Sequence, residues 1–455
     1  MSSSEQVSKS NGTKAEAIFN PTATIAASAA MFLACMDTLI TNLALPTIQE
    51  ELGASLAAQQ WIVDGYTLPF AALLLLAGNL SDRFGANRVF AWGTAAFGLS
   101  SLVCALASSA AMLVAGRVLL GISAAAILPS SMAVINEAYP NEAQRRHALA
   151  FWGIGGSAAS AAGPLMGGIL TPIHWSLVFS VNIPFCLLIL VLSRGLPSSE
   201  RVAKPFDLVG QALSIAGLTG LVGGIIEMGG EGPANPVADA LLVAGVSLLV
   251  LFVAWQGRSR APMMPLSLLG PAGMRMALVG GFVMIFNWNG AIFLVTLFLQ
   301  QVGGLSPLAA GLAFVPAAVT GAVGNIMSDR LTGVIGSKRA LLLGIALIAA
   351  GYLTLLVFAP GMDGTFAAVA ICLSAIGGGT STPLLTNLVL KSAPEGQTGI
   401  ASAMFNTFRQ VGGAVGIALF GALAASLATF TLGFQASFAV ALVLMAAMFA
   451  QAARL

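Results

Sequence analysis

The chain has 455 residues, of which 57% are hydrophobic and 8% are charged, and its formal net charge is +2. An ordinary soluble domain carries about 25% charged residues, so this chain has too few charges to cover a soluble body of its length. The apolar content also excludes a disordered chain, and the near-zero net charge offers no basic surface for nucleic acid. The composition predicts a protein whose main partner is the lipid bilayer.

About fourteen apolar runs are long enough to cross a bilayer, because a hydrocarbon core of about 30 Å requires roughly 20 apolar residues per helix. The connections between them are mostly short, so consecutive helices are expected to be antiparallel neighbours. The chain is therefore predicted to be an all-α polytopic membrane protein. The predicted spans are 23–46, 57–80, 88–108, 110–136, 148–171, 175–194, 207–229, 236–256, 275–300, 307–328, 339–359, 364–390, 399–426 and 430–453.

The distribution of basic residues predicts the topology. All but two of the 19 Lys and Arg residues lie in the tails or in alternate loops, and the exceptions are Arg117 and Arg409. The positive-inside rule then predicts that both termini lie in the cytoplasm. The expected location of the protein is the cytoplasmic (inner) membrane. The expected organisation is a disordered cytoplasmic tail, a six-helix bundle, two linker helices and a second six-helix bundle. Their boundaries are 1–22, 23–197, 198–262 and 263–455.

A short element recurs in the two bundles. Residues 78–88 read Gly-Asn-Leu-Ser-Asp-Arg-Phe-Gly-Ala-Asn-Arg, and residues 324–330 read Gly-Asn-Ile-Met-Ser-Asp-Arg, followed by a glycine and two basic residues. Both copies follow the second helix of a bundle. Duplicated bundles that rock around a site near the bilayer midplane are the architecture of alternating access, so the repeat predicts a transporter.

Several motifs occur in order on the helices where a known family carries them. They are Met-Asp-Thr-Leu-Ile-Thr-Asn-Leu-Ala-Leu-Pro at 36–46, Trp-Ile-Val-Asp-Gly-Tyr-Thr-Leu at 61–68, the 78–88 element, Arg-Val-Leu-Leu-Gly at 117–121 and Gly-Pro-Leu-Met-Gly-Gly at 163–168. On these residues the chain resembles the major facilitator superfamily. It is most similar to the fourteen-helix drug:proton antiporters, and among them to methylenomycin-resistance-type exporters.

The resemblance implies a secondary active transporter, not an enzyme, that exchanges inward-moving protons for an outward-moving drug or antibiotic. The energy source is then the proton gradient, with no cofactor and no metal. The expected partners are protons and a small lipophilic substrate, for which a cation is compatible, and the protein is expected to act as a monomer or with accessory efflux partners. The alternatives are export of an endogenous metabolite such as a self-made antibiotic, siderophore or amino acid, uptake symport, and a non-transporting receptor.

Asp37 and Arg117 are the first candidates for proton coupling. Asp37 lies deep in the first span, where a carboxylate costs several kcal/mol unless it is protonated, paired or hydrated. Thr41 shares its helix face, and Thr38 and Asn42 lie beside them, so we expect this polar stripe to line a cavity. Arginine cannot deprotonate to escape burial, so Arg117 requires an acid, carbonyls or water. The resemblance gives it a coupling role as a competitor with protons for an acid such as Asp37.

Three further intramembrane charges have more open interpretations. Asp64 lies near the outer end of its helix, where water can reach it, and is either a second proton or cation site or a solvated acid. Glu227 in the linker pair is read as a solvated acid near the outer end of its helix. Arg409 is a possible second-bundle counterpart of Arg117, with either a coupling role or a fixed buried ion pair.

Candidate substrate-binding residues are amides and aromatic rings within the spans. Amides at bilayer depth are costly in lipid but useful around a substrate, and aromatic rings stack on aromatic or cationic ligands. The candidates are Asn42, Tyr66, Trp152, Asn287, Trp288 and Asn289.

Candidate gating residues fall into two groups. The charged loop residues are expected to latch the two bundles on the cytoplasmic side, whereas the glycine–proline element is expected to form a tight, bendable seam between bundles. The alternatives are solvated turns and ordinary small-residue packing. The first group is Asp82, Arg83, Arg88, Asp329 and Arg330, and the second is Gly163, Pro164 and Gly167.

Overall fold

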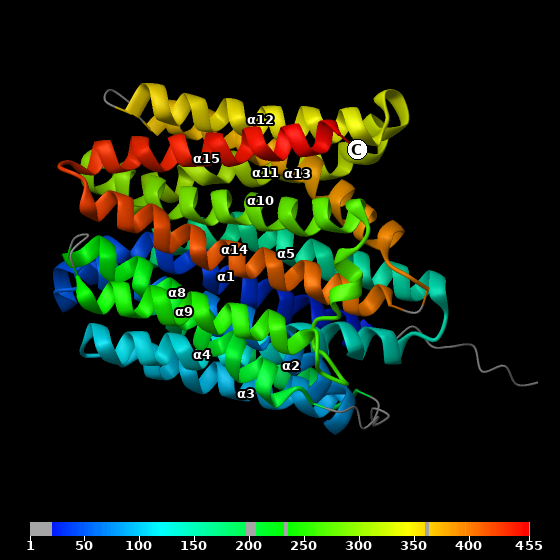
Figure 1. Cartoon of the computed structure of the whole chain (residues 1–455). Helices are drawn as coiled ribbons and strands as arrows, with labels where there is room; N and C mark the ends of the chain where they lie inside the picture. The colour runs from blue at the N-terminus through cyan, green and yellow to red at the C-terminus, as the bar shows by residue number, and fades with distance from the viewer. Residues whose placement is uncertain (1–20, 197–205, 232–234, 360–363, 396, 455) are drawn as a thin grey trace, which may run out of the picture.

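The computed structural model describes residues 21–196, 206–231, 235–359, 364–395 and 397–454, and within these ranges the regular structure is helical throughout. Most of the tail predicted at 1–22 lies outside them. Figure 1 shows the helices running roughly parallel in two groups, with the N-terminal helices below and the C-terminal helices above. The all-helical fold class predicted from the sequence is confirmed.

The N-terminal group contains the helices that follow the first six predicted spans. They are α1 (Pro21–Leu52), α2 (Leu56–Phe84), α3 (Ala86–Ala105), α4 (Ala110–Ala138), α5 (Glu142–Leu170), α6 (Leu177–Ser180) and α7 (Asn182–Ser193). The span predicted as one helix over 175–194 is divided at Val181 into α6 and α7. Pro184 explains the division, because it has no N–H to donate to the carbonyl of Ser180 four residues earlier.

The remaining helices comprise the linker pair and the C-terminal group. The linker pair is α8 (Leu208–Glu231) and α9 (Pro236–Gln256). The C-terminal group is η1 (Leu266–Leu269), α10 (Ala272–Leu297), η2 (Phe298–Val302), α11 (Pro307–Ile335), α12 (Ser337–Phe358), α13 (Gly364–Ser392), α14 (Thr398–Ser426) and α15 (Phe430–Ala453).

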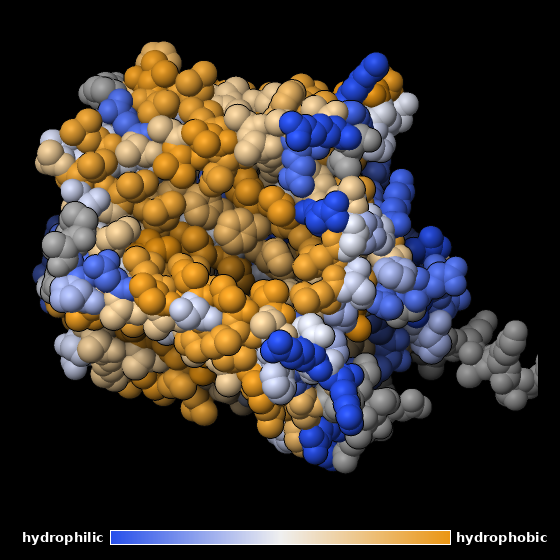
Figure 2. All heavy atoms as spheres, viewed as in Figure 1, coloured by the Kyte–Doolittle hydropathy of each residue, from blue (hydrophilic) through white to orange (hydrophobic). Residues whose placement is uncertain are grey.

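Twelve of the described helices are long and apolar enough to cross a membrane. The α6–α7 pair is a shorter apolar helix, and α5 is rich in the weakly apolar residues Gly, Ala and Ser. With these two, the number of spanning elements is near the fourteen predicted from the sequence. Figure 2 shows apolar residues over most of the face in view and most of the hydrophilic residues at one end of the helices. The protein is therefore a multi-pass membrane protein.

The two groups repeat one packing scheme. In the N-terminal group α1 packs on α5, and α4 packs on both α2 and α3; in the C-terminal group α10 packs on α14, and α13 packs on both α11 and α12. The repeated sequence element takes the same backbone form in both, since Gly85 and Gly336 have φ of 93° and 84° and separate two consecutive helices. Each glycine N–H bonds the carbonyl four residues earlier, at 3.0 Å. This left-handed conformation favours glycine, which explains why the repeat keeps it.

The two groups meet along two seams, α5 with α11 and α2 with α14. The linker helix α8 packs on both α2 and α14 and therefore covers the second seam. Its Gln211 side chain donates to the carbonyl of Ala72 on α2 at 2.7 Å. The α5–α11 seam lacks such a cover in the part of the chain that the structure describes. The linker pair thus makes the two lateral sides of the molecule different.

Glutamines join the two groups at the end of the molecule where α1 ends and α2 begins. Gln301, on the π-helical turn η2, donates to Gln49 of α1 at 2.9 Å, and Gln49 also accepts from Gln59 of α2 at 2.9 Å. Nearby, Gln300 donates to the carbonyl of Leu43 at 3.3 Å, and Gln60 donates to the carbonyl of Ala418 at 2.8 Å. These contacts hold the two groups together at this end of the helices.

Candidate functional site

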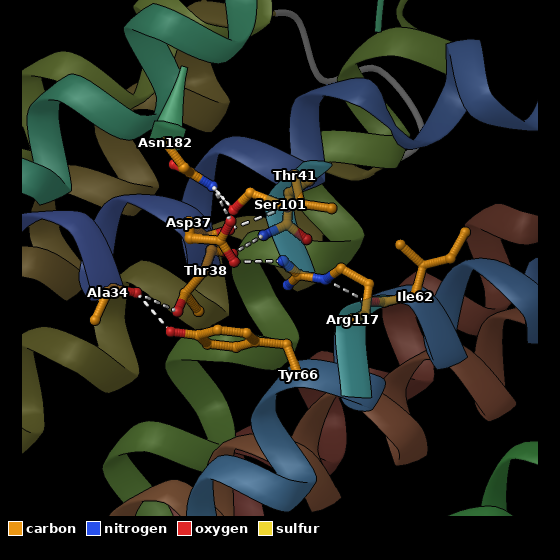
Figure 3. A network of polar contacts seen from close by, with 10 residues as sticks. Ala34, Asp37, Thr38, Thr41, Ile62, Tyr66, Ser101, Arg117 and Asn182 are labelled. Carbon is orange, nitrogen blue, oxygen red and sulfur yellow. Dashed lines mark hydrogen bonds and ion pairs between the residues drawn. The ribbon is translucent and has the colours of Figure 1, made fainter. Parts of the chain in front are cut away.

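A buried ion pair lies inside the N-terminal group. The guanidinium of Arg117, on α4, bonds Oδ2 of Asp37, on α1, and both side chains have 0% exposure. Figure 3 shows the two side chains pointing toward each other between their helices. The sequence placed both charges at bilayer depth and named them as possible partners, and the structure brings them together.

Arg117 has further contacts on α2. Its Nε donates to the carbonyl of Ile62 at 2.8 Å, and its guanidinium carbon lies 4.6 Å from the centre of the Tyr66 ring. Such a cation–π contact is favourable, and more so where water is excluded. The Phe179 ring of α6 lies 5.8 Å away. One nitrogen, Nη2, is buried without a hydrogen-bond partner among the described residues. Arg117 is thus held by groups other than Asp37 as well.

The second carboxylate oxygen of Asp37 has a partner that the sequence reasoning missed. The Nδ2 of Asn182, at the start of α7, donates to Asp37 Oδ1 at 2.8 Å and reaches Ser101 Oγ of α3 at 3.3 Å. Figure 3 shows Asn182 approaching the carboxylate from the side opposite Arg117. An amide inside the apolar run 175–194, two residues before a proline, is the signal that could have identified this position.

Tyr66 is part of this polar network. Its hydroxyl donates to the carbonyl of Ala34 on α1 at 2.9 Å, and its side chain has 0% exposure. The ring lies between Arg117 and the α1 backbone (Figure 3). In this arrangement Tyr66, which the sequence suggested for substrate binding, supports the ion pair and does not face an open cavity.

The hydroxyls and the amide of the α1 polar stripe bond to their own helix. Thr41 Oγ1 donates to the carbonyl of Asp37 at 3.0 Å, Thr38 Oγ1 to that of Ala34 at 3.1 Å, and Asn42 Nδ2 to that of Thr38 at 3.1 Å. Asp37 and Thr41 are fully buried. Asp37, Thr41 and Asn42 are therefore covered by neighbouring helices here, whereas Thr38 is partly exposed.

Asp64, on α2, is a second buried carboxylate. Its side chain has 0% exposure, although the sequence placed it where water reaches the helix. Thr67 Oγ1 donates to its Oδ1 at 2.8 Å, and its Oδ2 has no hydrogen-bond partner among the described residues. The difference arises because α2 is packed against α4, α8 and α14, which together exclude water from its outer half.

The three neighbouring candidates on α10 point in different directions. Asn287 is fully buried, and neither its nitrogen nor its oxygen has a hydrogen-bond partner among the described residues. Trp288 borders a small pocket of about 10 Å³, together with Phe314 and Tyr352. Asn289 lies against Gly413 of α14. The three side chains do not converge on one site in this conformation.

Two other candidates have local partners. Trp152, on α5, donates its indole N–H to Ser131 Oγ of α4 at 3.0 Å. Arg409, on α14, donates to Asn406 Oδ1 at 3.3 Å and lies 5.6 Å from the ring of Phe405. Arg409 thus differs from Arg117, because its recorded polar partner is an amide on its own helix.

The glycine–proline element of α5 forms two contacts. Gly163 and Gly167 lie against α1, where an added Cβ would stand 2.8 Å from Leu39 Cβ and 2.8 Å from the Ile40 carbonyl, respectively. The Pro164 carbonyl lies against Gly311 of α11, across the seam between the groups. The element therefore packs within its own group as well as between the groups.

The charged loop candidates lie at the hydrophilic end of the molecule. Asp82 is partly buried, whereas Arg83, Arg88, Asp329 and Arg330 are exposed. The Arg83 guanidinium carbon lies 5.8 Å from the ring of Phe84 and 5.1 Å from that of Phe206, which precedes α8. The latch predicted from the sequence stays a prediction.

A polar cluster that sequence reasoning missed fastens the linker pair. Asp207, just before α8, accepts hydrogen bonds from Gly210 N–H at 2.9 Å and from the side chains of Trp255 and Gln256, both at 2.7 Å. Partial burial raises the pKa of the Asp207 carboxyl, but these hydrogen bonds outweigh it and hold the pKa below its ordinary value. Gln256 in turn accepts from Met264 N–H at 2.9 Å.

Two helix groups that repeat one packing scheme, with a buried charge pair inside the first, are the architecture of a transporter of the major facilitator type. Residues 27–417 match the family described as the Major Facilitator Superfamily, and the chain belongs to it. It is accordingly a transporter and not an enzyme.

Among its relatives, the chain is 32% identical over 398 residues to the methylenomycin A resistance protein of Bacillus subtilis, covering 86% of this chain and 84% of the relative. It is 33% identical over 396 residues to the multidrug efflux pump LfrA of Mycolicibacterium smegmatis, covering 86% and 78%.

Solved structures show the same fold. The human organic anion transporter MFSD10 aligns with a TM-score of 0.64 at 16% identity, covering 95% of this chain and 99% of that one. The inward open conformation of the xylose transporter XylE from E. coli aligns with a TM-score of 0.65 at 15% identity, covering 93% and 94%. At these identities the likeness concerns the fold alone.

Proposed function

We propose that the protein exports small lipophilic, drug-like molecules across the cytoplasmic membrane in exchange for protons, by alternating access. The names of its relatives, which include antibiotic-resistance proteins and multidrug efflux pumps, support drug efflux. The repeated helix groups support alternating access, because each group can move as one body against the other. The basic loops support cytoplasmic termini.

The buried Asp37–Arg117 pair is the observation that carries proton coupling. Both charges are fully removed from water, so each depends on the other for its stability. Leaving one of two buried partners unpaired costs about 3–5 kcal/mol. A proton that binds Asp37 therefore changes the energy of this region strongly, and such a change is what drives a two-state protein from one conformation to another.

The other partners of Arg117 make this protonation feasible. When Asp37 is neutral, the guanidinium keeps the carbonyl of Ile62 and the ring of Tyr66, both of which favour a cation. The protonated state is thus not left with a bare buried charge. Asp37 carries the proton, and Arg117 expels it by re-forming the pair. Asp64 is a candidate second proton carrier, because it is buried with one oxygen unpartnered among the described residues.

We assign substrate contact to the C-terminal group and to α1. Asn287 and Asn42 each present a buried amide atom without a hydrogen-bond partner among the described residues. Such groups are costly unless a ligand or water pairs with them. Trp288, the next residue on α10, supplies an aromatic ring in the same group. The substrate is a small lipophilic molecule, and a lipophilic cation such as ethidium is a suitable probe.

Proton exchange in inside-out membrane vesicles tests this function. The vesicles are energised to acidify their interior, and ethidium, rhodamine 6G or puromycin is added while the internal pH is followed with a fluorescent dye. We expect the wild-type protein to release protons on addition of at least one probe. We expect Asp37→Asn to abolish the release, because the amide cannot carry a proton.

Glu50→Gln is the matched control, since it makes the same chemical change on the same helix at an exposed position. It should respond like the wild type. Full proton release by Asp37→Asn would refute its role as proton carrier, and a wild-type response only under the opposite gradient would refute export.

A further inference from the structure

Asn182 occupies a special position in the helix that carries it. It is the first residue of α7, directly after the interruption at Val181, and its side chain has 0% exposure. Pro184 cannot donate to the carbonyl of Ser180, so α6 and α7 are separate and the Asn182 side chain lies at a helix start inside the membrane-spanning region. Primary amides are costly at such depth unless their donor and acceptor atoms are paired.

The Asn182 amide is only half paired. Its Nδ2 donates to Asp37 Oδ1 at 2.8 Å and to Ser101 Oγ at 3.3 Å. Its Oδ1 is buried and has no hydrogen-bond partner among the described residues. A buried acceptor left in this state costs about 1–3 kcal/mol. The arrangement thus stabilises the carboxylate form of Asp37, and it leaves the Asn182 amide oxygen without a hydrogen bond among the described residues.

Arg117 and Asn182 divide the carboxylate between them. Arg117 bonds Oδ2, and Asn182 bonds Oδ1. Protonated Asp37 requires an acceptor for its O–H. Arginine has no acceptor atom, whereas an asparagine amide offers one donor end and one acceptor end. Of the two side chains on this carboxyl, Asn182 alone can both donate to the carboxylate and accept from the O–H of the acid.

We propose that Asn182 is a positioning residue for proton coupling. Its Nδ2 donates to Asp37 when Asp37 is a carboxylate. After the amide turns by about half a rotation, its Oδ1 accepts the hydrogen bond from Asp37 when Asp37 is a carboxylic acid. This role rests on the proposed function of Asp37. The proton adds to Asp37 Oδ1, and Asn182 itself gains and loses none. The turn gives Oδ1 the Asp37 O–H as its donor and leaves Nδ2 where Oδ1 had no partner, so one atom of the amide is paired with Asp37 in each state.

Other groups face Asp37 as well. Arg117 on α4 is the charged one, and Tyr66 on α2, Cys104 on α3 and Cys186 on α7 are titratable groups that interact with it electrostatically. Phenols and thiols ordinarily titrate above pH 8 and are neutral below it. The part of the transport pH profile that Asp37→Asn removes therefore reports Asp37 and its hydrogen bonds, and any part that remains is assigned to other groups such as Asp64.

The test uses the full-length protein in proteoliposomes, with ethidium transport measured against pH. In Asn182→Leu the side chain keeps its size and loses both hydrogen-bonding ends. A hydrogen bond to a charged group is stronger than one to a neutral group, so the carboxylate loses more than the acid. We expect the pH of half-maximal transport to rise by about one unit and the maximal rate to fall about tenfold.

Three variants separate this role from a structural one. Asn182→Ser, whose hydroxyl both donates and accepts, should restore a midpoint closer to that of the wild type. Asn87→Leu removes an asparagine that bonds the Leu196 carbonyl at 3.3 Å elsewhere in the same group, and it should leave the midpoint unchanged. In an Asp37→Asn background, Asn182→Leu should alter neither the pH profile nor the rate further.

Infrared difference spectra between low and high pH supply a direct readout. In wild-type protein, an isotope-edited asparagine carbonyl band should shift when Asp37 protonates, and the shift should be absent in Asn182→Leu and in Asp37→Asn. If transport depends on Asp37 but Asn182→Leu keeps the wild-type pH midpoint and maximal rate, the proposal for Asn182 is overturned and the proposed function stands. Full coupling in Asp37→Asn would overturn the proposed function itself.

Discussion

The N-terminal and C-terminal helix groups share a scaffold but differ in their interiors. In both, glycines let the first helix approach the fifth, as Gly167 does against the Ile40 carbonyl and Gly416 against the Phe286 carbonyl. Inside the first group lies the Asp37–Arg117 pair with its polar partners. The interior of the second is filled by phenylalanine rings, with centre-to-centre distances of 5.6 Å between Phe286 and Phe420, 5.9 Å between Phe420 and Phe438, and 4.7 Å between Phe438 and Phe434.

This difference teaches that a duplicated fold need not duplicate its chemistry. The shared features are backbone features: close helix approach and left-handed glycines at the turns. The unshared features are side chains in the space that these backbones enclose. We infer a division of labour in which charge coupling lies in the first group, and substrate contact lies mainly in the second group with Asn42 of α1 added from the first.

The largest expected effect comes from breaking the ion pair that distinguishes the first group. Arg117→Met leaves the Asp37 carboxylate buried without its cation, and should destabilise the protein by about 3–5 kcal/mol and abolish proton-coupled ethidium transport. The double variant Asp37→Asn with Arg117→Met should regain most of the stability but not the transport. Thermal unfolding of purified protein checks the first effect, and a double variant no more stable than Arg117→Met would contradict it.

A smaller effect is expected from the feature that both groups share. An added Cβ at Gly416 would stand 2.1 Å from the Phe286 carbonyl oxygen, and one at Gly167 would stand 2.8 Å from that of Ile40. Overpacking costs typically 1–3 kcal/mol, so Gly416→Ala should lower thermal stability by about that much and Gly167→Ala by less. Gly153→Ala meets no atom within 4 Å and should instead stabilise its helix by about 1 kcal/mol. The reverse order in unfolding experiments would show that these helix contacts within the groups are not tight.

Replacing Asn287, the buried amide of the second group, tests whether substrate contact and proton coupling lie in different groups. Asn287→Leu replaces a buried polar group that lacks a partner among the described residues, so stability should be unchanged or slightly higher. Because we assign this amide to substrate contact, the KM for a transported probe should rise several-fold while the pH profile stays that of the wild type. A shifted pH midpoint would instead tie Asn287 to proton coupling.

The smallest effect concerns Asp207, which lies outside both groups. Its hydrogen bonds lower the carboxyl pKa, so its contribution to stability is fully present above the unfolded-state value of about 4 and is lost as pH falls through the folded-state value. Asp207→Ala should cost about 1 kcal/mol at neutral pH, since the group is partly exposed. Unfolding measured from pH 7 down to pH 3 should show the variant and the wild type converging; a constant gap would contradict this.

Much of the fold was predictable because lipid constrains sequence so strongly. Apolar runs of bilayer length predicted nearly every helix, and the recurring Gly-Asn element predicted matching places in the two groups, where the structure has turns of one backbone form. The division of 175–194 into α6 and α7 was missed. Hydropathy registers Pro184 only weakly, whereas its missing N–H interrupts the helix.

The sequence by itself determined that Asp37 and Arg117 are costly at their depth and need partners, since that cost follows from charge and burial alone. Only the tertiary structure decided that they pair with each other, that Asn182 takes the second carboxylate oxygen and that Tyr66 lies against the guanidinium. These choices depend on how four separate helices rotate and cross. Those rotations are fixed by packing between segments as far as 145 residues apart in the chain.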